Sequence, residues 1–361
     1  MKRIGILTSG GDCQGLNSTI RAVAKTLYQN YGNDGVQIIG IIDGYRGLIY
    51  NETRMMKPDD FSGILTRGGT ILGTSRQPFK LMRVIDENSV DKVAEMKKNY
   101  KKLELDCLVV LGGNGTQKTA NLLREEGLNV VSLPKTIDND LWGTDKTFGF
   151  QSAVDIATNV IDCIHTTATS HGRVFIVEVM GHKVGWLTLY AGIAGGADVI
   201  LIPEIPYDIN SVINTIKKRT ESGKKFSILA VAEGAISKEL AAMPKKKRKA
   251  AMAEIAYPSI SYKIAKEIQD ATGHETRVTV PGHFQRGGSP DAYDRVLSTR
   301  FGIAAAELII NGDYGKMVAL VNNKVVAVPL EEIAGKLKAV PADHEIVAAA
   351  RKMGIAFGDE K

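Results

Sequence analysis

The chain has 361 residues, of which 44% are hydrophobic and 24% are charged, and its formal net charge is +6. The composition is close to globular averages and the length exceeds that of most single cores, so we expect a folded protein of two domains. The longest nearly apolar stretch, GIAGGADVILI, is shorter than the roughly 20 residues of a membrane span, which excludes a transmembrane helix.

Two features predict a cytoplasmic location. The N-terminal stretch MKRIGILTSGG has the pattern of a strand rather than of a secretion signal. The cysteines Cys13, Cys107 and Cys163 are odd in number and lack metal-type spacing. We therefore expect reduced thiols, with neither a disulfide framework nor a zinc site.

The positive charge is concentrated in one segment, PKKKRK at 244–249, between the helix-forming stretches SKELAAM and AAMAEIA. Such short basic runs resemble nuclear localisation signals, but they more often form a solvated helix face or an insertion. The rest of the chain is close to neutral, so we expect neither nucleic acid nor a membrane as a partner.

Short runs of Val, Ile and Leu alternate with helix-like segments, beginning with a strand and a helix from Leu16 to about Asn30. The runs show no alternation of polar and apolar residues, which is the pattern of a parallel sheet covered on both faces. We therefore predict an α/β fold, with a further helix over 118–127. The predicted strands are 3–8, 36–42, 106–113, 128–134, 173–181, 197–203, 226–234 and 275–282.

The loop SGGDCQGLNSTIR, at 9–21, lies between a predicted strand and a helix. Gly10 and Gly11 let backbone amides approach an anion, and the positive end of the helix points into the same space. Glycines at this place also serve tight turns, about equally often. The loop lacks the GxGxxG spacing and the distal acidic residue of a dinucleotide site, which disfavours a dehydrogenase.

A second loop of this kind is LGGNGTQK at 111–118, in which Gly112, Gly113 and Gly115 follow a strand. We expect Thr116 to begin the next helix, so that strand, turn and helix end again form an anion cradle. Ligands of open parallel sheets bind at the carboxyl ends of the strands. Two such loops at one sheet edge suggest a polyphosphate.

A third loop, TRGGTILGTSRQ at 66–77, contains two arginines. Arg67 or Arg76 can cap phosphate oxygens with a guanidinium fork. Taken by itself, Arg76 is more typical of an ordinary surface residue.

The most specific stretch is PKTIDNDLWGTD at 134–145. In an extended strand Asp138 and Asp140 project to one side, together with Thr136. One carboxylate can accept a proton from a substrate hydroxyl while the other orients the substrate or binds a hydrated Mg²⁺. The alternative is an acidic surface turn, which the two nearby phosphate loops make less favourable.

These stretches together resemble the 6-phosphofructokinase family. The matching pieces occur in the family's order over nearly the whole chain: TSGGDCQGLN, LGGNGT, PKTIDND, TSHGRVFIVEVMG, VAEG and PGHFQRGGSPDAYDR. The resemblance implies two Rossmann-like α/β domains with mostly parallel sheets and an active site in the cleft. It also implies the glycolytic transfer of a phosphoryl group from ATP–Mg²⁺ to the 1-hydroxyl of fructose 6-phosphate.

The resemblance divides the chain into a donor domain, 1–149 plus about 286–335, and a fructose 6-phosphate domain, 150–285 plus about 336–361. On the donor side it implies Asp138 as the base, with Thr136 and Asp140 beside it. It assigns the donor phosphates, nucleotide and metal to Gly11, Arg76, Lys135 and the loop Gly112, Gly113, Asn114, Gly115 and Thr116, with Asn114 and Asp140 at the Mg²⁺ ion.

For the acceptor, the resemblance implies that Met180, Gly181, His182 and Glu233 hold the sugar. The 6-phosphate falls to His283 and Arg286, joined by Arg173 and Arg277 from a neighbouring subunit, so a homo-oligomer, dimer or tetramer, is expected, with Arg173 also taking part in catalysis. Unaided, Arg173 and Arg277 are typical of solvated strand ends. His283 with Arg286 beside paired glycines suits a phosphate monoester better.

The sequence departs from the family at the donor loops. Asn114 stands where ATP-dependent members carry a metal-associated aspartate, and its amide oxygen ligates Mg²⁺ without adding negative charge. Pyrophosphate users usually carry an aspartate at the position of Gly115 and a lysine at that of Lys135. Here the small residue favours ATP and the lysine favours pyrophosphate; we give the steric requirement at Gly115 more weight.

Other departures concern the acceptor and the effectors. His182 replaces an arginine that faces the sugar phosphates in many members. Arg21 matches an arginine of the bacterial regulatory site, but Lys25 replaces a second one, so no effector is predicted. Two alternatives to the ATP-dependent kinase stay open: a pyrophosphate-dependent phosphotransferase, and a non-catalytic phosphosugar or nucleotide sensor.

Overall fold

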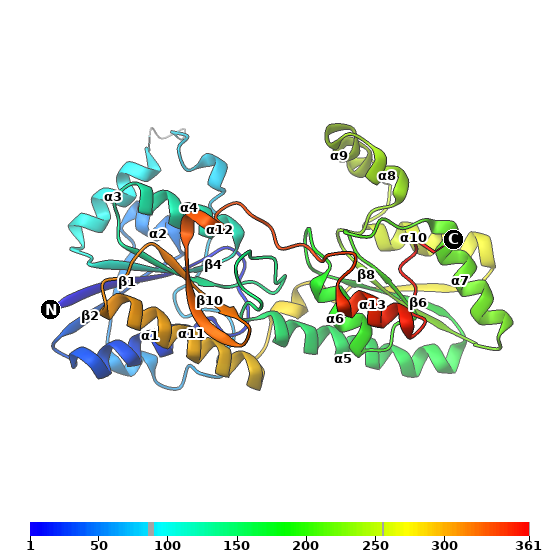
Figure 1. Ribbon diagram of the computed structural model, residues 1–361, viewed down its shortest axis with the longest axis horizontal. Coiled ribbons are helices and arrows are strands. Elements are labelled where there is room, and N and C mark those ends of the chain that lie inside the picture. Colours follow the sequence, from blue (N-terminus) through cyan, green and yellow to red (C-terminus); the bar gives the residue numbers. More distant parts are fainter. Residues whose placement is uncertain (86–89, 255, 361) are drawn as a thin grey trace. The chain divides into compact units, whose positions relative to one another are not determined.

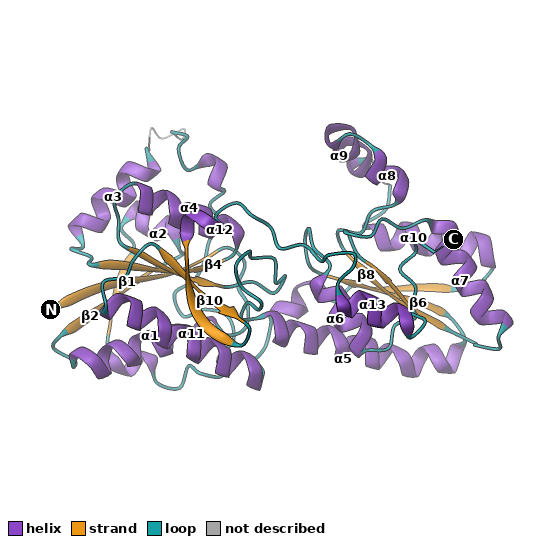
Figure 2. Cartoon of the chain, in the orientation of Figure 1, coloured by secondary structure: helices purple, strands orange, loops and turns teal. Residues whose placement is uncertain are grey.

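The computed structural model describes residues 1–85, 90–254 and 256–360. The chain divides into two compact units. Unit 1 comprises Met1–Ser152 and Arg286–Lys338, and unit 2 comprises Ala153–Gln285 and Ala339–Lys361. Each unit contains one sheet with helices on both faces, as Figures 1 and 2 show, so the predicted α/β class is confirmed.

Unit 1 has a seven-stranded sheet in the order β11-β10-β5-β4-β1-β2-β3. Its inner strands are parallel, whereas β3 and β11 pair antiparallel at the two edges. Its strands are β1 Lys2–Ser9, β2 Val36–Ile41, β3 Thr53–Met56, β4 Cys107–Gly112, β5 Val130–Pro134, β10 Lys316–Val321 and β11 Lys324–Pro329.

The helices of unit 1 cover both faces of this sheet because its central strands are apolar on both sides. One face packs against α2, α3, α4 and α12, and the other face is covered by the pair α1 and α11. These helices are α1 Leu16–Tyr31, α2 Tyr45–Tyr50, α3 Lys92–Lys102, α4 Asn114–Glu125, α11 Ala292–Ile310 and α12 Leu330–Ile333, with 3-10 turns η1 Pro58–Phe61 and η2 Phe79–Leu81.

Unit 2 has a four-stranded parallel sheet in the order β7-β8-β6-β9. Helices α7 and α10 pack on one face, and α6 packs against β7 and β8. The strands are β6 Val174–Val179, β7 Val199–Leu201, β8 Ser227–Ala232 and β9 Thr276–Thr279. The helices are α5 Phe150–His171, which starts in unit 1, α6 Trp186–Ala194, α7 Ile209–Glu221, α8 Lys238–Ala242, α9 Lys245–Ala253, α10 Ile260–Thr272 and α13 Glu345–Lys352; η3 is Gly282–Arg286.

The basic run 244–249 lies on α9, which together with α8 stands away from the sheet of unit 2 (Figure 1). Its lysines are exposed. This arrangement is the solvated helix expected from the sequence; part of the predicted helix over 250–256 lies outside the described residues.

All three cysteines are free thiols: Cys13 and Cys107 are buried and Cys163 is exposed. Within the described ranges, no helix has the length and apolar character needed to cross a membrane.

Candidate active site

In unit 1, three loops follow neighbouring strands at the same edge of the sheet. Strands β1, β4 and β5 are parallel neighbours, and their last residues are paired in register: Ser9 with Gly112, and Gly112 with Pro134. The loops that follow these strands therefore emerge side by side. These are the two glycine loops and the acidic stretch that the sequence pointed to.

The first loop is held from two sides. Thr74 Oγ1 donates a hydrogen bond to the carbonyl oxygen of Gly10 at 2.6 Å, and the Gly10 amide donates to the Ser75 carbonyl at 3.1 Å. The exposed Arg76 follows directly, so its guanidinium is tethered near this loop. The loop at 66–77 thus belongs to the same edge.

Gly11 has side chains packed closely around it. The Lys135 ammonium donates to the Gly11 carbonyl oxygen, and a Cβ added at Gly11 would lie 2.1 Å from Nη1 of Arg286. A side chain at this position would have to displace the guanidinium of Arg286. Arg286, which the family resemblance assigns to the acceptor phosphate, therefore lies against the donor loop in unit 1.

The second loop opens helix α4, which begins at Asn114 with Gly113 as its N-cap, two residues before the predicted start at Thr116. The first backbone bond of the helix runs from the Gln117 amide to the Gly113 carbonyl at 2.9 Å. The amides that precede Gln117 have no partner within the helix, so this end can bind an anion. Thr116 Oγ1 donates to the Ser9 carbonyl at 3.4 Å, which joins this loop to the first.

Gly115 lies on the open side of this helix end. It is exposed, and a Cβ built on it would meet no heavy atom within 4 Å. The fold itself does not require a glycine at this position. The space beside it is therefore free for a ligand.

The third loop differs from the expectation. We predicted that Thr136, Asp138 and Asp140 would share one side of an extended strand, and this geometry is wrong. Strand β5 ends at Pro134, and Asn139 has a left-handed φ of 53°. The Asp138 amide donates to Thr136 Oγ1 at 3.0 Å, so the threonine hydroxyl closes a local turn in place of a sheet hydrogen bond.

The structure brings the two predicted metal ligands together. Asn114 Nδ2 donates to Asp140 Oδ2 at 3.1 Å and to the Asp140 carbonyl at 3.3 Å, and both residues are partly buried. No cluster of three or more acidic, histidine or cysteine side chains suited to a metal is found among the described residues. A metal here would have few protein ligands.

Lys135 is the most buried charge at this edge, with 4% of its surface exposed. Burial lowers the pKa of its ammonium, and Arg286 acts in the same direction. Cys13, Asp138 and Asp12 raise the pKa. The coupling to Asp138 links the acidic loop electrostatically to the lysine that contacts Gly11.

A second group of predicted residues gathers in unit 2, at the carboxyl ends of β6 and β8. Glu233 Oε1 accepts hydrogen bonds from the amides of Gly181 at 3.3 Å and His182 at 2.7 Å. The Met180 amide donates to Gln285 Oε1 at 3.2 Å. The exposed His182 has a φ of 52°, so the Glu233 carboxylate fixes a tight turn that presents the imidazole.

Arg173 and Arg277 lie at the opposite end of this sheet: Arg173 directly precedes β6, and Arg277 is the second residue of β9. Both guanidinium groups contact the carboxylate of Glu275. From Arg173 to Met180 the chain runs about 23 Å, at about 3.3 Å per residue. Within one chain, therefore, these arginines do not join the group around Glu233.

His283 and Arg286 share the short helix η3 but belong to different units. His283 is exposed in unit 2, whereas Arg286 contacts Gly11 in unit 1. Two further residues of unit 1, Asn139 and Lys338, were not predicted. Asn139 lies within the acidic stretch PKTIDNDLWGTD, which could have drawn attention to it, whereas no local pattern marks Lys338.

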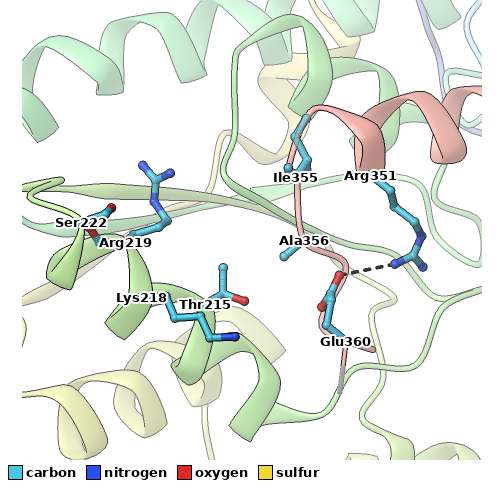
Figure 3. A pocket seen from close by; sticks show the side chains of 9 residues that line it. Thr215, Lys218, Arg219, Ser222, Arg351, Ile355, Ala356 and Glu360 are labelled. Atoms are coloured by element: carbon cyan, nitrogen blue, oxygen red, sulfur yellow. Dashed lines mark hydrogen bonds and ion pairs between the residues drawn. The ribbon is translucent and has the colours of Figure 1, made fainter.

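Unit 2 also contains a cavity of about 570 Å³ between α7 and α13 (Figure 3). Arg351 is paired with Asp359 and Glu360, and Arg219 with Asp198. The cavity is lined by none of the residues predicted from the sequence. The described lining residues are Thr215, Lys218, Arg219, Ser222, Arg351, Gly354, Ile355, Ala356 and Glu360.

Comparison with known proteins gives consistent relatives over the whole chain. Residues 3–309 match the family model described as Phosphofructokinase. The chain is 60% identical to the ATP-dependent 6-phosphofructokinase of Spirochaeta thermophila, over 99% of this chain and 98% of the relative. It is 52% identical to ATP-dependent 6-phosphofructokinase 3 of Bacteroides thetaiotaomicron, over 99% of this chain and all of the relative.

Among solved structures, the phosphofructokinase of Saccharomyces cerevisiae superposes with a TM-score of 0.79 at 31% identity. The match covers 92% of this chain but only 45% of the yeast chain. The sequence and structural relatives agree with each other. The chain therefore belongs to the phosphofructokinase family.

Proposed function

We propose that the protein is an ATP-dependent 6-phosphofructokinase, which transfers the γ-phosphoryl group of ATP to the 1-hydroxyl of fructose 6-phosphate. This reaction, a step of glycolysis, gives fructose 1,6-bisphosphate and ADP. The observation that carries the proposal is the identity of 60% and 52% to two full-length relatives with this name. The arrangement in this chain agrees with it, because the two glycine loops and the acidic loop follow adjacent strands. The cytoplasmic location expected from the sequence is part of the proposal.

The donor groups are those of unit 1. The amides after Gly10 and at the start of α4 provide hydrogen bonds to phosphate oxygens, and the helix end adds partial positive charge. Lys135, whose side chain contacts the Gly11 carbonyl, and Arg76, which follows the Ser75 carbonyl that accepts from Gly10, add positive charge to the loop. Phosphoryl transfer depends mostly on such positioning and charge neutralisation.

Asp138 is the proposed base. Its carboxylate accepts the proton of the sugar 1-hydroxyl as the hydroxyl oxygen bonds to the γ-phosphorus, and the bond from that phosphorus to the β-phosphate oxygen breaks. Thr136 fixes the turn through its bond to the Asp138 amide. Asp138 is partly exposed, so a substrate can reach it.

The donor set at Asn114 and Asp140 fits Mg²⁺. This ion commonly takes one or two protein oxygens and completes its shell with waters and phosphates. The Asp140 carboxylate and the Asn114 amide oxygen are the residues that would hold it. When bound, the ion neutralises charge on the phosphates.

The sugar groups are those of unit 2: Met180, Gly181, His182, Glu233 and His283. Arg173 and Arg277 lie at the other end of the sheet and cannot join them from the same chain. Their use for the 6-phosphate, as in the family, therefore requires a second copy. This is our reason for proposing a homo-oligomer.

Pyrophosphate is the alternative donor, and Lys135 is the observation that favours it. The ammonium of Lys135, however, is directed to the Gly11 carbonyl, and nothing fills the space beside Gly115. Space for the nucleotide supports ATP. A sensor without catalysis is disfavoured because Thr136, Asp138 and Asp140 are all present.

The test is a purified-protein assay with fructose 6-phosphate, Mg²⁺ and either ATP or pyrophosphate, in which fructose 1,6-bisphosphate is measured. We expect product with ATP, and a fall in kcat of about 10²-fold or more for Asp138→Asn, the usual effect of losing a positioned base. Substrate binding by the variant should be nearly unchanged. Product with pyrophosphate alone would replace ATP as the donor, and activity with neither would favour the sensor.

A further inference from the structure

The turn that carries Asp138 and Asp140 is held by a segment much later in the chain. Leu337 forms an isolated antiparallel bridge with Leu141, and the Lys338 amide donates to the Asp140 carbonyl at 2.9 Å. Both contacts lie within unit 1, whose last residue is Lys338. The backbone of this segment therefore runs directly along the acidic loop.

The ammonium of Lys338 is fully engaged in this loop. It donates to Asn139 Oδ1 at 3.0 Å, to the Thr144 carbonyl at 2.7 Å and to the Asp145 carbonyl at 2.9 Å. A lysine ammonium has three N–H donors, so each acceptor can receive one. Three acceptors from both ends of the loop thus meet at one nitrogen atom, Nζ of Lys338.

Asn139 connects Nζ of Lys338 to the two residues that carry the carboxylates. It lies between Asp138 and Asp140, is 2% exposed and has a φ of 53°. Asparagine adopts the left-handed conformation more readily than most residues other than glycine, and here hydrogen bonds of its side chain hold it. Oδ1 of Asn139 also accepts from the Thr147 amide at 3.1 Å, and its Nδ2 donates to the Asp145 carbonyl at 3.3 Å.

We propose that Lys338 is a positioning residue, whose ammonium fixes the Asn139 turn and thereby the direction of the Asp138 carboxylate. The inference rests on the proposed function, because it assigns Asp138 as the base. Removing the ammonium leaves three oxygens without their shared donor. The turn then loses the contact that joins its two ends, and Asp138 samples more orientations.

The first test does not depend on activity. Lys338→Met keeps most of the apolar stem and removes the ammonium, and Lys102→Met is the control, an exposed lysine of α3 in the same unit. Hydrogen exchange followed by mass spectrometry should show amides in 139–147 exchanging about tenfold faster in Lys338→Met. Exchange in the control should match that of the wild type. Unchanged exchange in Lys338→Met would overturn the proposal.

The second test measures phosphorylation of fructose 6-phosphate. We expect kcat to fall about tenfold or more in Lys338→Met, because small displacements of a reacting group are costly, while the KM for ATP stays within about twofold. In an Asp138→Asn background, the same lysine change should lower the residual kcat less than twofold, since residues that act through one another are not additive. Independent, multiplicative losses would show that Lys338 does not act through Asp138.

The two tests separate failure of the function from failure of the inference. A wild-type protein without activity would refute the proposed function, while hydrogen exchange would still decide whether Lys338 holds the turn. Faster exchange with an unchanged kcat would overturn the link to Asp138. If Lys338→Met does not fold, Lys338→Leu, which also removes the ammonium and keeps an apolar side chain, takes its place with the same criteria.

Discussion

Replacing Asn114 by aspartate should lower the Mg²⁺ requirement of the enzyme. Asn114 Nδ2 lies 3.1 Å from Asp140 Oδ2, so Asn114→Asp exchanges a hydrogen-bond donor for a second carboxylate beside the first. Without metal the two negative charges repel each other. With Mg²⁺ they become a chelating pair of the kind that this ion prefers.

The size of the effect follows from this distance. Two unit charges about 4 Å apart interact by about 1 kcal/mol in water and about 4 kcal/mol at an effective dielectric constant of about 20. Both side chains are partly exposed, so we take about 1–2 kcal/mol of repulsion that Mg²⁺ relieves. Because about 1.4 kcal/mol corresponds to a factor of ten in an equilibrium constant, the half-saturating concentration of free Mg²⁺ should fall about tenfold.

The assay varies free Mg²⁺ at fixed MgATP and fructose 6-phosphate. Asn114→Ala is the control, because it removes the hydrogen bond to Asp140 without adding charge and should not lower the requirement. Thermal unfolding gives a second readout: Tm without metal should be lower in Asn114→Asp, and Mg²⁺ should raise it more than in the wild type. An equal or higher Mg²⁺ requirement in Asn114→Asp would refute the assignment of this pair to the metal.

Three further predictions concern donor choice, pH and thiol reactivity. Gly115→Asp should leave Tm nearly unchanged, since no atom lies within 4 Å of the new Cβ, but should raise the KM for ATP at least tenfold; an unchanged KM would exclude Gly115 from the nucleotide site. Burial raises the pKa of Asp294 to about 6, above the ordinary value of about 3.9, so the folded state binds more protons between these values and stability falls as pH rises through that window. From pH 5 to pH 7 this loss is about 1 kcal/mol, and Asp294→Asn should lack it when urea unfolding is compared at the two pH values; the same loss in the variant would contradict the assignment. Iodoacetamide at pH 8 should label the exposed Cys163 and not Cys13, because burial raises the pKa of the Cys13 thiol to about 12; equal labelling by mass spectrometry would contradict this burial.

The parallel strands were predictable because their signal is local. All eight predicted strands are present, and helix α1 begins at Leu16 as expected. The edge strand β3 was missed because its residues TRMM are half exposed and lack the apolar run of a central strand. The hairpin β10–β11 was also missed, although its turn, Asn322 and Asn323, has two left-handed residues of the type that favours two-residue hairpins.

The grouping of the donor loops was predictable for a related reason. In a parallel sheet, loops that follow neighbouring strands share one edge, so a strand pattern with two glycine turns is sufficient to bring Gly11 and Asn114 to the same place. The conformation of 136–140 was not predictable in this way. Alternation applies only while a partner strand continues, and β4 ends at Gly112, opposite Pro134.

Beyond Pro134, contacts distant in sequence determine the geometry of the acidic loop. Lys338 lies far from Asp138 along the chain, and it belongs to no pattern that marks it for this place. A parallel sheet fixes where a strand ends but leaves the following residues without a ladder partner, so their backbone polar groups need other partners. Lys338 supplies these partners for the carbonyl oxygens of Asp140, Thr144 and Asp145, and its ammonium also holds the Asn139 side chain. The residues that perform the chemistry can therefore be predicted from a short motif. The side chains that fix their orientation come from distant segments, whose position only the folded structure shows.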